Sequence, residues 1–168
     1  MDATQLKNLQ APLKEKYKAE PQAAIITLKA QGKISEGVSC SVETGQSIVK
    51  AGLHPATGGT GLLACSGNLL LEALVACAGV TLRAVATAIG VHIKDGSSVM
   101  AEGDLDFKGT LGVSKDVPVG FKNIRLSFHL DTDATAEQMD SLKKLTERYC
   151  VVYQTLVNGV NIETQYNI

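Results

Sequence analysis

The sequence of 168 residues contains no tryptophan, and aromatic residues make up only 4% of it. A hydrophobic core must therefore be built from Leu, Val, Ile and Ala, whose smaller side chains let neighbouring elements approach closely. The sequence also lacks a polybasic run, and its net charge of −1 gives no electrostatic support for a nucleic-acid or anionic-membrane partner. With 45% hydrophobic and 20% charged residues, the chain has a globular composition, which excludes disorder throughout.

The sequence shows no secretory signal, because residues 1–21 are amphipathic and lack the apolar stretch that such a signal needs. We therefore expect a cytoplasmic protein, in which stable structural disulfides are not favoured. The cysteines also lack the short spacings of a zinc knuckle or a CxxC redox motif. They are Cys40, Cys65, Cys77 and Cys150. These thiols are either inert and buried, or two of them form a redox pair.

The histidines give no sign of a metal centre. His54, His92 and His129 share no metal-ligand spacing with one another or with an acidic residue, so neither a metal nor another cofactor is expected. A GxSxG nucleophile motif is also missing, and the glycine-rich segment lacks the pattern of a nucleotide-binding loop. The chemistry must therefore come from other side chains, if the protein is an enzyme.

The length predicts one domain over residues 1–168, with a helical arm over 1–20 and a core over 21–168. The arm is predicted as a helix over 3–18 that starts or kinks at Pro12. A three-stranded antiparallel meander follows, with strands over 23–34, 37–42 and 47–53.

A glycine-rich connector over 54–68 leads into a long apolar helix predicted over 69–89 and ended by Gly90. Apolar residues surround its axis, which predicts burial on most sides and indicates that a partner chain supplies part of the cover. A membrane span is disfavoured because Glu72 and Arg83 lie within the segment and alanine is abundant in it.

The second half of the chain predicts three strands and one more helix. The strands are expected over 91–94, 99–111 and 123–130, with a linker over 109–121. The helix starts at a capping box from Thr135 to Gln138, directs Met139, Leu142, Leu145 and Tyr149 inward, and ends near Cys150. A turn and a last strand follow it. This order indicates an α+β fold and not an alternating parallel-sheet fold.

Two of the cysteines are candidates for redox chemistry. Burial alone would raise the pKa of the Cys77 thiol and make it inert, so reactivity requires a nearby donor or cation. Thr81, one turn on, is placed to donate a hydrogen bond, whereas Arg83 lies on another face of the helix. Cys150 at a helix C-terminus meets partial negative charge, which suits a resolving thiol better than a nucleophile. Buried, unreactive cysteines remain the alternative for both.

Two segments carry a resemblance to a known family. Residues 67–90, GNLLLEALVACAGVTLRAVATAIG, resemble the central-helix signature of the OsmC/Ohr family, and residues 147–156, ERYCVVYQTL, resemble its second cysteine motif. The resemblance implies an OsmC-like intertwined homodimer, with antiparallel sheets wrapped around long central helices. It also implies a thiol-dependent peroxidase for organic hydroperoxides or hydrogen peroxide, acting in oxidative-stress defence.

The resemblance implies that Cys77 is the peroxidatic thiol, which the peroxide oxidises to a sulfenic acid. It implies that Cys150 then reacts with this sulfenic acid to form a disulfide, which a cellular dithiol reduces. The partners implied are a second copy of the chain, a hydroperoxide and a dithiol.

The chain departs from the family pattern at three places. Peroxidases of the family use an arginine from the N-terminal half to activate the thiolate, but this chain has no arginine before Arg83. Just before the central helix, either Gly67 or Asn68 stands where the family usually has a glutamate. Val151 stands where a proline usually follows the second cysteine. Arg83, Thr81 and Lys50 are candidates for supporting the thiolate, and the cations among them come from either chain of a dimer. The alternative function is an OsmC-like redox-responsive or apolar-ligand-binding protein with little peroxidase turnover.

Overall fold

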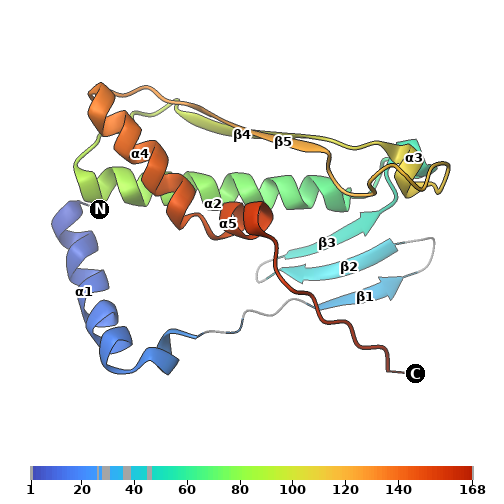
Figure 1. Cartoon of the computed structure of the whole chain (residues 1–168), viewed down its shortest axis with the longest axis horizontal. Coiled ribbons are helices and arrows are strands. Elements are labelled where there is room, and N and C mark those ends of the chain that lie inside the picture. Colours follow the sequence, from blue (N-terminus) through green and yellow to red (C-terminus); the bar gives the residue numbers. More distant parts are fainter. Residues whose placement is uncertain (1, 26, 28–30, 36–38, 45–46, 168) are drawn as a thin grey trace. The chain divides into compact units, whose positions relative to one another are not determined.

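The computed structural model describes residues 2–25, 27, 31–35, 39–44 and 47–167 (Figure 1). The chain forms two compact units. The first contains Met1–Lys7, Ala73–Met100 and Phe128–Ile168, and the second contains Asn8–Glu72 and Ala101–Ser127. The division into an arm over 1–20 and a core over 21–168 stays a prediction.

The N-terminal helix α1 spans Ala3–Ala19 and continues through Pro12, so it does not start there as one form of the prediction had it. Its start is fixed by a reciprocal pair of hydrogen bonds. The Gln5 N–H donates to Asp2 Oδ1 at 2.8 Å, and the Asp2 N–H donates to Gln5 Oε1 at 3.0 Å. Such a pair satisfies N–H groups that the first turn of a helix leaves free. The stabilisation offsets part of the cost of the hydrogen bond that Pro12, which has no N–H, cannot make.

The predicted meander is confirmed as a three-stranded antiparallel sheet in the order β1-β2-β3. The strands are β1 (Gln31–Ser35), β2 (Ser39–Thr44) and β3 (Ser47–Gly52). The first strand is shorter than predicted, because a 3-10 helix, η1 (Pro21–Ala24), occupies part of its range. Proline suits the first position of a helix, which favours this turn. Residues 26, 28–30, 37 and 38 of the predicted strands lie outside the described residues.

The connector contains a short 3-10 helix, η2 (Pro55–Thr57), whose Ala56 N–H donates to His54 Nδ1 at 3.1 Å. Helix α2 then spans Ser66–Ile89, beginning slightly earlier than predicted and ending, as predicted, before Gly90, which has a φ of 73°. Only glycine takes such a backbone conformation without strain.

Within the single chain, the buried residues of α2 recur every fourth position and form one stripe: Leu74, Ala78, Leu82 and Ala86. Other positions of the helix are half-buried or exposed, and Val80 is 73% exposed. Burial on most sides, with a partner chain supplying part of the cover, stays a prediction. Within the described residues α2 is the one helix long and apolar enough to cross a membrane, a test that the core helix of a soluble protein also passes.

The second sheet has two strands, β4 (Ser98–Asp104) and β5 (Asn123–His129). The strand predicted over 99–111 ends at Asp104, because Asp106 accepts a hydrogen bond from the Lys108 N–H and starts the short helix α3 (Phe107–Thr110). The strand predicted over 91–94 is reduced to one bridge between Ile93 and Thr132.

Helix α4 spans Ala136–Tyr149 and begins at the predicted capping box. The Gln138 N–H donates to Thr135 Oγ1, and the Thr135 N–H donates to Gln138 Oε1. After α4 the chain enters another helix, α5 (Val151–Asn158), in place of the predicted turn and strand (Figure 1). Residues 159–167 form no strand.

The core of the first unit joins α2 to α4. Its buried residues are Leu82, Ala86, Val91, Ile93 and Leu142. On α4 the inward face differs from the prediction at its end, because Tyr149 is 59% exposed and Thr146 is buried in its place. The fold class is confirmed as α+β with antiparallel sheets.

Candidate functional site

The first unit brings together the two cysteines that the sequence singled out. Cys77 lies in the middle of α2, next to the fully buried Ala78. Cys150 lies between α4 and α5 and is 1% exposed, whereas Cys77 is half-buried. The two thiols influence each other's pKa, which indicates that they lie near one another. Both sulfurs are free thiols.

The start of α5 supplies further donors to Cys77. Cys150 has extended backbone angles, φ −74° and ψ 108°, and so ends α4 and precedes α5. The first hydrogen bond within α5 runs from the Gln154 N–H to the Cys150 carbonyl at 2.9 Å. The N–H groups of Val151 and Val152 precede it and have no acceptor within their own helix. Both amides are among the causes that lower the pKa of Cys77.

These donors set the pKa of Cys77 below its ordinary value. Burial is the largest single influence and raises the pKa, but four hydrogen bonds together outweigh it. They come from the Val152 N–H, the Cys150 thiol, the Thr81 hydroxyl and the Val151 N–H. Each stabilises the thiolate more than the neutral thiol. Thr81, one turn along α2, is among the groups that lower this pKa, and its support of a reacting thiolate stays a prediction.

Cys150 is shifted in the opposite direction. Burial raises its pKa most, and the hydrogen bond and negative charge of Cys77 raise it further. The N–H groups of Tyr153 and Val152 only partly oppose these effects. Two interacting thiols thus differ in their readiness to ionise, and the first thiolate forms on Cys77. The sequence predicted that Cys150 lies at the C-terminus of a helix. In the structure it also directly precedes the N-terminus of a second helix, α5.

Neither Arg83 nor Lys50, the two cationic candidates, is among the causes that lower the pKa of Cys77. Arg83 Nη1 donates to the Ile93 carbonyl at 2.8 Å. Lys50 lies on β3, opposite Ser41, in the second unit and is exposed. The hydrogen-bond donors found at Cys77 are two backbone amides, a hydroxyl and a thiol, none of which is charged.

The other cysteines are not part of this pair. Cys65 is half-buried in the connector of the second unit, and Cys40 lies in β2 opposite Ile34 and Ala51. Within the described ranges, no group of three His, Cys, Asp or Glu side chains is arranged to hold a metal ion.

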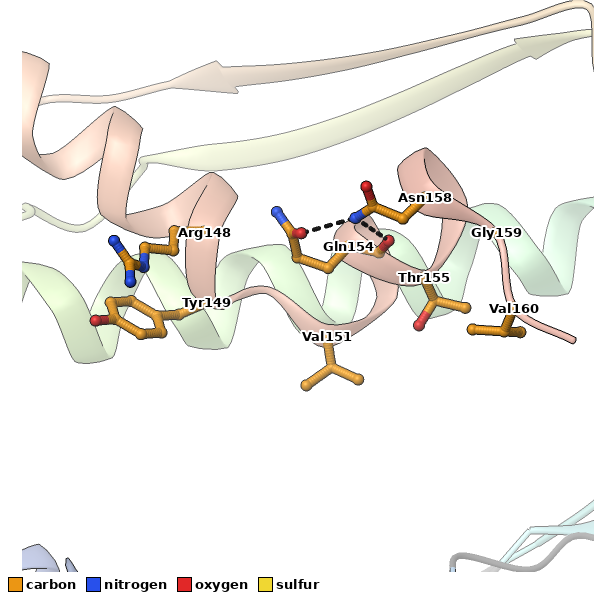
Figure 2. A pocket seen from close by; sticks show the side chains of 8 residues that line it. All are labelled: Arg148, Tyr149, Val151, Gln154, Thr155, Asn158, Gly159 and Val160. Atoms are coloured by element: carbon orange, nitrogen blue, oxygen red, sulfur yellow. Dashed lines mark hydrogen bonds between the residues drawn. The ribbon is translucent and has the colours of Figure 1, made fainter.

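An open concavity of about 450 Å³ runs along α5 (Figure 2). Val151 lines it with a side chain that is 70% exposed, so the residue whose N–H meets Cys77 also faces this surface. The other residues around it are Arg148, Tyr149, Gln154, Thr155, Asn158, Gly159 and Val160. Gln154 ties the two helices together, since its Nε2 donates to the Glu147 carbonyl at 2.8 Å.

Sequence reasoning missed α5 and therefore the backbone donors to Cys77. The β-branched pair Val151 and Val152 favoured a strand locally. A helix signal was nevertheless present at the other end of the segment, because Asn158 and Gly159 form a sequence that commonly ends a helix.

Comparison with known proteins identifies related chains. The model of the family described as OsmC-like protein matches residues 59–165. No curated protein matches at a significant level.

Solved structures share the fold at low identity. An OsmC-like protein from Mycoplasma pneumoniae is 18% identical with a TM-score of 0.65, over 80% of this chain and 89% of that chain. An organic hydroperoxide resistance protein OsmC from Legionella pneumophila is 18% identical with a TM-score of 0.61, over 79% and 90%. The organic hydroperoxide resistance protein OhrB of Bacillus subtilis is 19% identical with a TM-score of 0.53, over 82% and 96%.

Proposed function

This chain belongs to the OsmC-like protein family, and from that premise we propose that it is a two-cysteine peroxidase that reduces organic hydroperoxides or hydrogen peroxide. The observation that carries the proposal is the pair of free thiols, Cys77 and Cys150, that influence each other and whose pKa values shift in opposite directions. A lowered pKa at Cys77 provides the attacking thiolate, and a raised pKa keeps Cys150 protonated until it is needed. The names of the hydroperoxide resistance proteins that share the fold support the same chemistry.

In the first step the Cys77 thiolate attacks the terminal oxygen of the hydroperoxide. The sulfur–oxygen bond forms as the oxygen–oxygen bond breaks, and the sulfur is oxidised to a sulfenic acid. The leaving alkoxide, or hydroxide from hydrogen peroxide, takes a proton from water and departs as an alcohol or as water. Burial beside Ala78 limits the access of other nucleophiles to the sulfenic acid.

In the second step Cys150 resolves the sulfenic acid. Its sulfur, after losing a proton, attacks the Cys77 sulfur, and the sulfenic oxygen leaves with protons as water. The product is a Cys77–Cys150 disulfide. A dithiol then reduces this disulfide by thiol–disulfide exchange, which returns both thiols and leaves the reductant as its own disulfide.

The protein acts as a homodimer in this proposal. In the first unit several large apolar side chains are exposed in the single chain: Val80, Val151, Val157, Val160, Ile162 and Tyr166. The apolar positions of residues 160–166 alternate, a pattern typical of a strand with one buried face. A second copy of the chain covers them. A cytoplasmic location and the lack of nucleic-acid or membrane partners stay predictions from the sequence.

Light scattering coupled to size-exclusion chromatography tests the assembly. We expect a mass of about twice 17.7 kDa. Replacing the exposed Val80 by glutamate places a charge on the open face of α2, and we expect it to shift the protein towards the monomer. A wild-type mass near 17.7 kDa contradicts the dimer.

A turnover assay tests the activity. Reduced protein is mixed with cumene hydroperoxide or hydrogen peroxide, and peroxide loss is followed with dithiothreitol or dihydrolipoamide as reductant. We expect turnover that is lost in Cys77→Ser. Turnover that is absent in the wild type, or unchanged in this variant, sinks the peroxidase proposal.

The alternative function is a redox-responsive or apolar-ligand-binding protein with slow turnover. The observation that favours it is the open concavity along α5, where Tyr149, Val151 and Val160 expose apolar surface. Formation of the Cys77–Cys150 disulfide with one equivalent of peroxide, without catalytic turnover in excess dithiol, would favour this function over the peroxidase.

A further inference from the structure

We propose that the Thr146 hydroxyl supports the resolving step of the peroxidase cycle: it donates a hydrogen bond to the Cys150 sulfur when that sulfur becomes a thiolate and attacks the oxidised Cys77. The inference rests on the proposed function, because it names a group that assists the second thiol of that cycle. It gives a role to a buried hydroxyl that the sequence did not single out.

Thr146 is a polar residue inside an apolar core. It is 3% exposed, and its Oγ1 has no hydrogen-bond partner among the described residues. A threonine within a helix often donates to the carbonyl four residues before it. Thr87 on α2 does so, with the Arg83 carbonyl at 2.8 Å, whereas the Thr146 hydroxyl does not. A buried hydroxyl without a partner costs stability, but it has no hydrogen bond to break when an acceptor forms beside it.

The spacing along α4 places this hydroxyl beside Cys150. The Cys150 N–H donates to the Thr146 carbonyl at 3.0 Å, so one helical turn joins the two residues. Side chains four residues apart in a helix lie on the same face, with about 5–6 Å between their Cβ atoms. Leu142, Thr146 and Cys150 follow this spacing, and all three are buried. Because Leu142 belongs to the core that α4 shares with α2, this face of α4 is directed at the helix that carries Cys77.

A thiolate formed at Cys150 needs a donor close by. The side chain is almost completely buried, so bulk water does not reach the sulfur, and burial raises the pKa of this thiol. In the resolving step the Cys150 sulfur loses its proton and bonds to the Cys77 sulfur, while the bond from that sulfur to the sulfenic oxygen breaks. The oxygen takes up the proton and leaves as water. Thr146 keeps its own proton and shares it with the attacking sulfur in a hydrogen bond, which stabilises the thiolate.

The test is the rate of disulfide formation after one equivalent of hydrogen peroxide in the reduced full-length protein. Acid quenching followed by intact-mass measurement separates the sulfenic acid on Cys77 from the Cys77–Cys150 disulfide. Thr146→Val keeps the shape of the side chain, so the sulfenic acid should form at the wild-type rate. The disulfide should then form about tenfold more slowly, because one hydrogen bond to a charged group is lost. The sulfenic acid should therefore accumulate in this variant.

Three further variants separate the hydroxyl from packing. Thr146→Ser keeps the hydroxyl and should resolve close to the wild-type rate, whereas Thr146→Ala lacks it and should repeat the delay even if Thr146→Val does not fold. Thr87→Val is the matched control, because its hydroxyl is bound within α2, and it should change neither step. A folded Thr146→Val protein that forms the disulfide at the wild-type rate overturns the inference. A delay of equal size in Thr146→Ser also overturns it.

A second measurement needs no peroxide. Dithiodipyridine converts Cys77 into a mixed disulfide, and the Cys150 thiolate then displaces the bound thiopyridone as the internal disulfide forms. Intact mass follows the loss of this group, which Cys150→Ser should abolish. We expect the displacement to slow about tenfold in Thr146→Val and to be unchanged in Thr87→Val. A wild-type protein that is inactive towards peroxide removes the proposed function, whereas equal displacement rates in wild type and Thr146→Val remove the inference.

Discussion

Cys77 and Cys150 are the same side chain in contact with one another, yet their surroundings shift them in opposite directions. Burial raises the pKa of both. Cys77 nevertheless ends below its ordinary value, because hydrogen bonding to two amides, a hydroxyl and a thiol outweighs burial. Cys150 ends above its ordinary value, because burial is the largest influence and the hydrogen bond and negative charge of Cys77 add to it. The comparison teaches that burial and the supply of hydrogen-bond donors together decide which thiol ionises.

The largest effect is expected when each cysteine is replaced by serine in turn, because the two variants should give different oxidation products. With one equivalent of peroxide, wild-type protein should form the Cys77–Cys150 disulfide. Cys150→Ser should stop at a sulfenic acid on Cys77 that dimedone traps, and Cys77→Ser should show no oxidation above the background rate. Intact-mass measurement distinguishes the three products. A disulfide that persists in Cys77→Ser, formed by Cys150 with another cysteine, would contradict the assigned roles.

The next largest effect is a difference in reactivity between the two thiols. Because the pKa of Cys77 is lowered and that of Cys150 is raised, Cys77 holds the larger thiolate fraction at any pH below both pKa values. At pH 7 we expect iodoacetamide to label Cys77 at least about tenfold faster than Cys150, since one pKa unit is a factor of ten in thiolate. The advantage should shrink as the pH rises above both pKa values. Equal labelling rates at pH 7 would contradict the opposite pKa shifts of the two thiols.

A smaller change should follow from the loss of the Thr81 hydroxyl. Thr81→Val keeps the shape of the side chain and removes one donor to Cys77, so the pKa of Cys77 should rise by about half a unit to one unit. The matched control is Thr87→Val on the same helix, where the hydroxyl donates to the Arg83 carbonyl at 2.8 Å. Alkylation against pH should detect a shift in the first variant only. A shift of equal size in both would point to a general effect on α2.

The smallest expected effect is a change in the free energy of unfolding caused by a substitution near Cys150. Thr146 is buried on α4 one turn before Cys150, and its hydroxyl has no hydrogen-bond partner among the described residues. Thr146→Val removes this unpaired group with little change of shape, so the free energy of unfolding should increase by about 1 kcal/mol. Denaturant unfolding measures the change. A loss of stability would show that the hydroxyl has a partner in solution, such as a water molecule.

The features that the sequence determined by itself are the starts and ends of elements that depend on neighbouring residues. Thr135 and Gln138 fixed the start of α4, Gly90 fixed the end of α2, and alternating residues gave the β1-β2-β3 meander. Each of these signals acts between residues a few positions apart, where hydrogen bonding and side-chain periodicity are set by the chain itself. The cysteines of the candidate pair were found because their motifs resemble those of a family.

Only the tertiary structure decided the surroundings of those cysteines. Val151 and Val152 favour a strand by their branching, yet they begin a helix, and their amides are among the causes that lower the pKa of Cys77, a residue far away in the sequence. No local rule links these positions, because the contact exists only after α4 packs its Leu142 against the core beside α2. The sequence therefore determined which thiols are candidates, and packing decided which of them receives the donors that favour a thiolate.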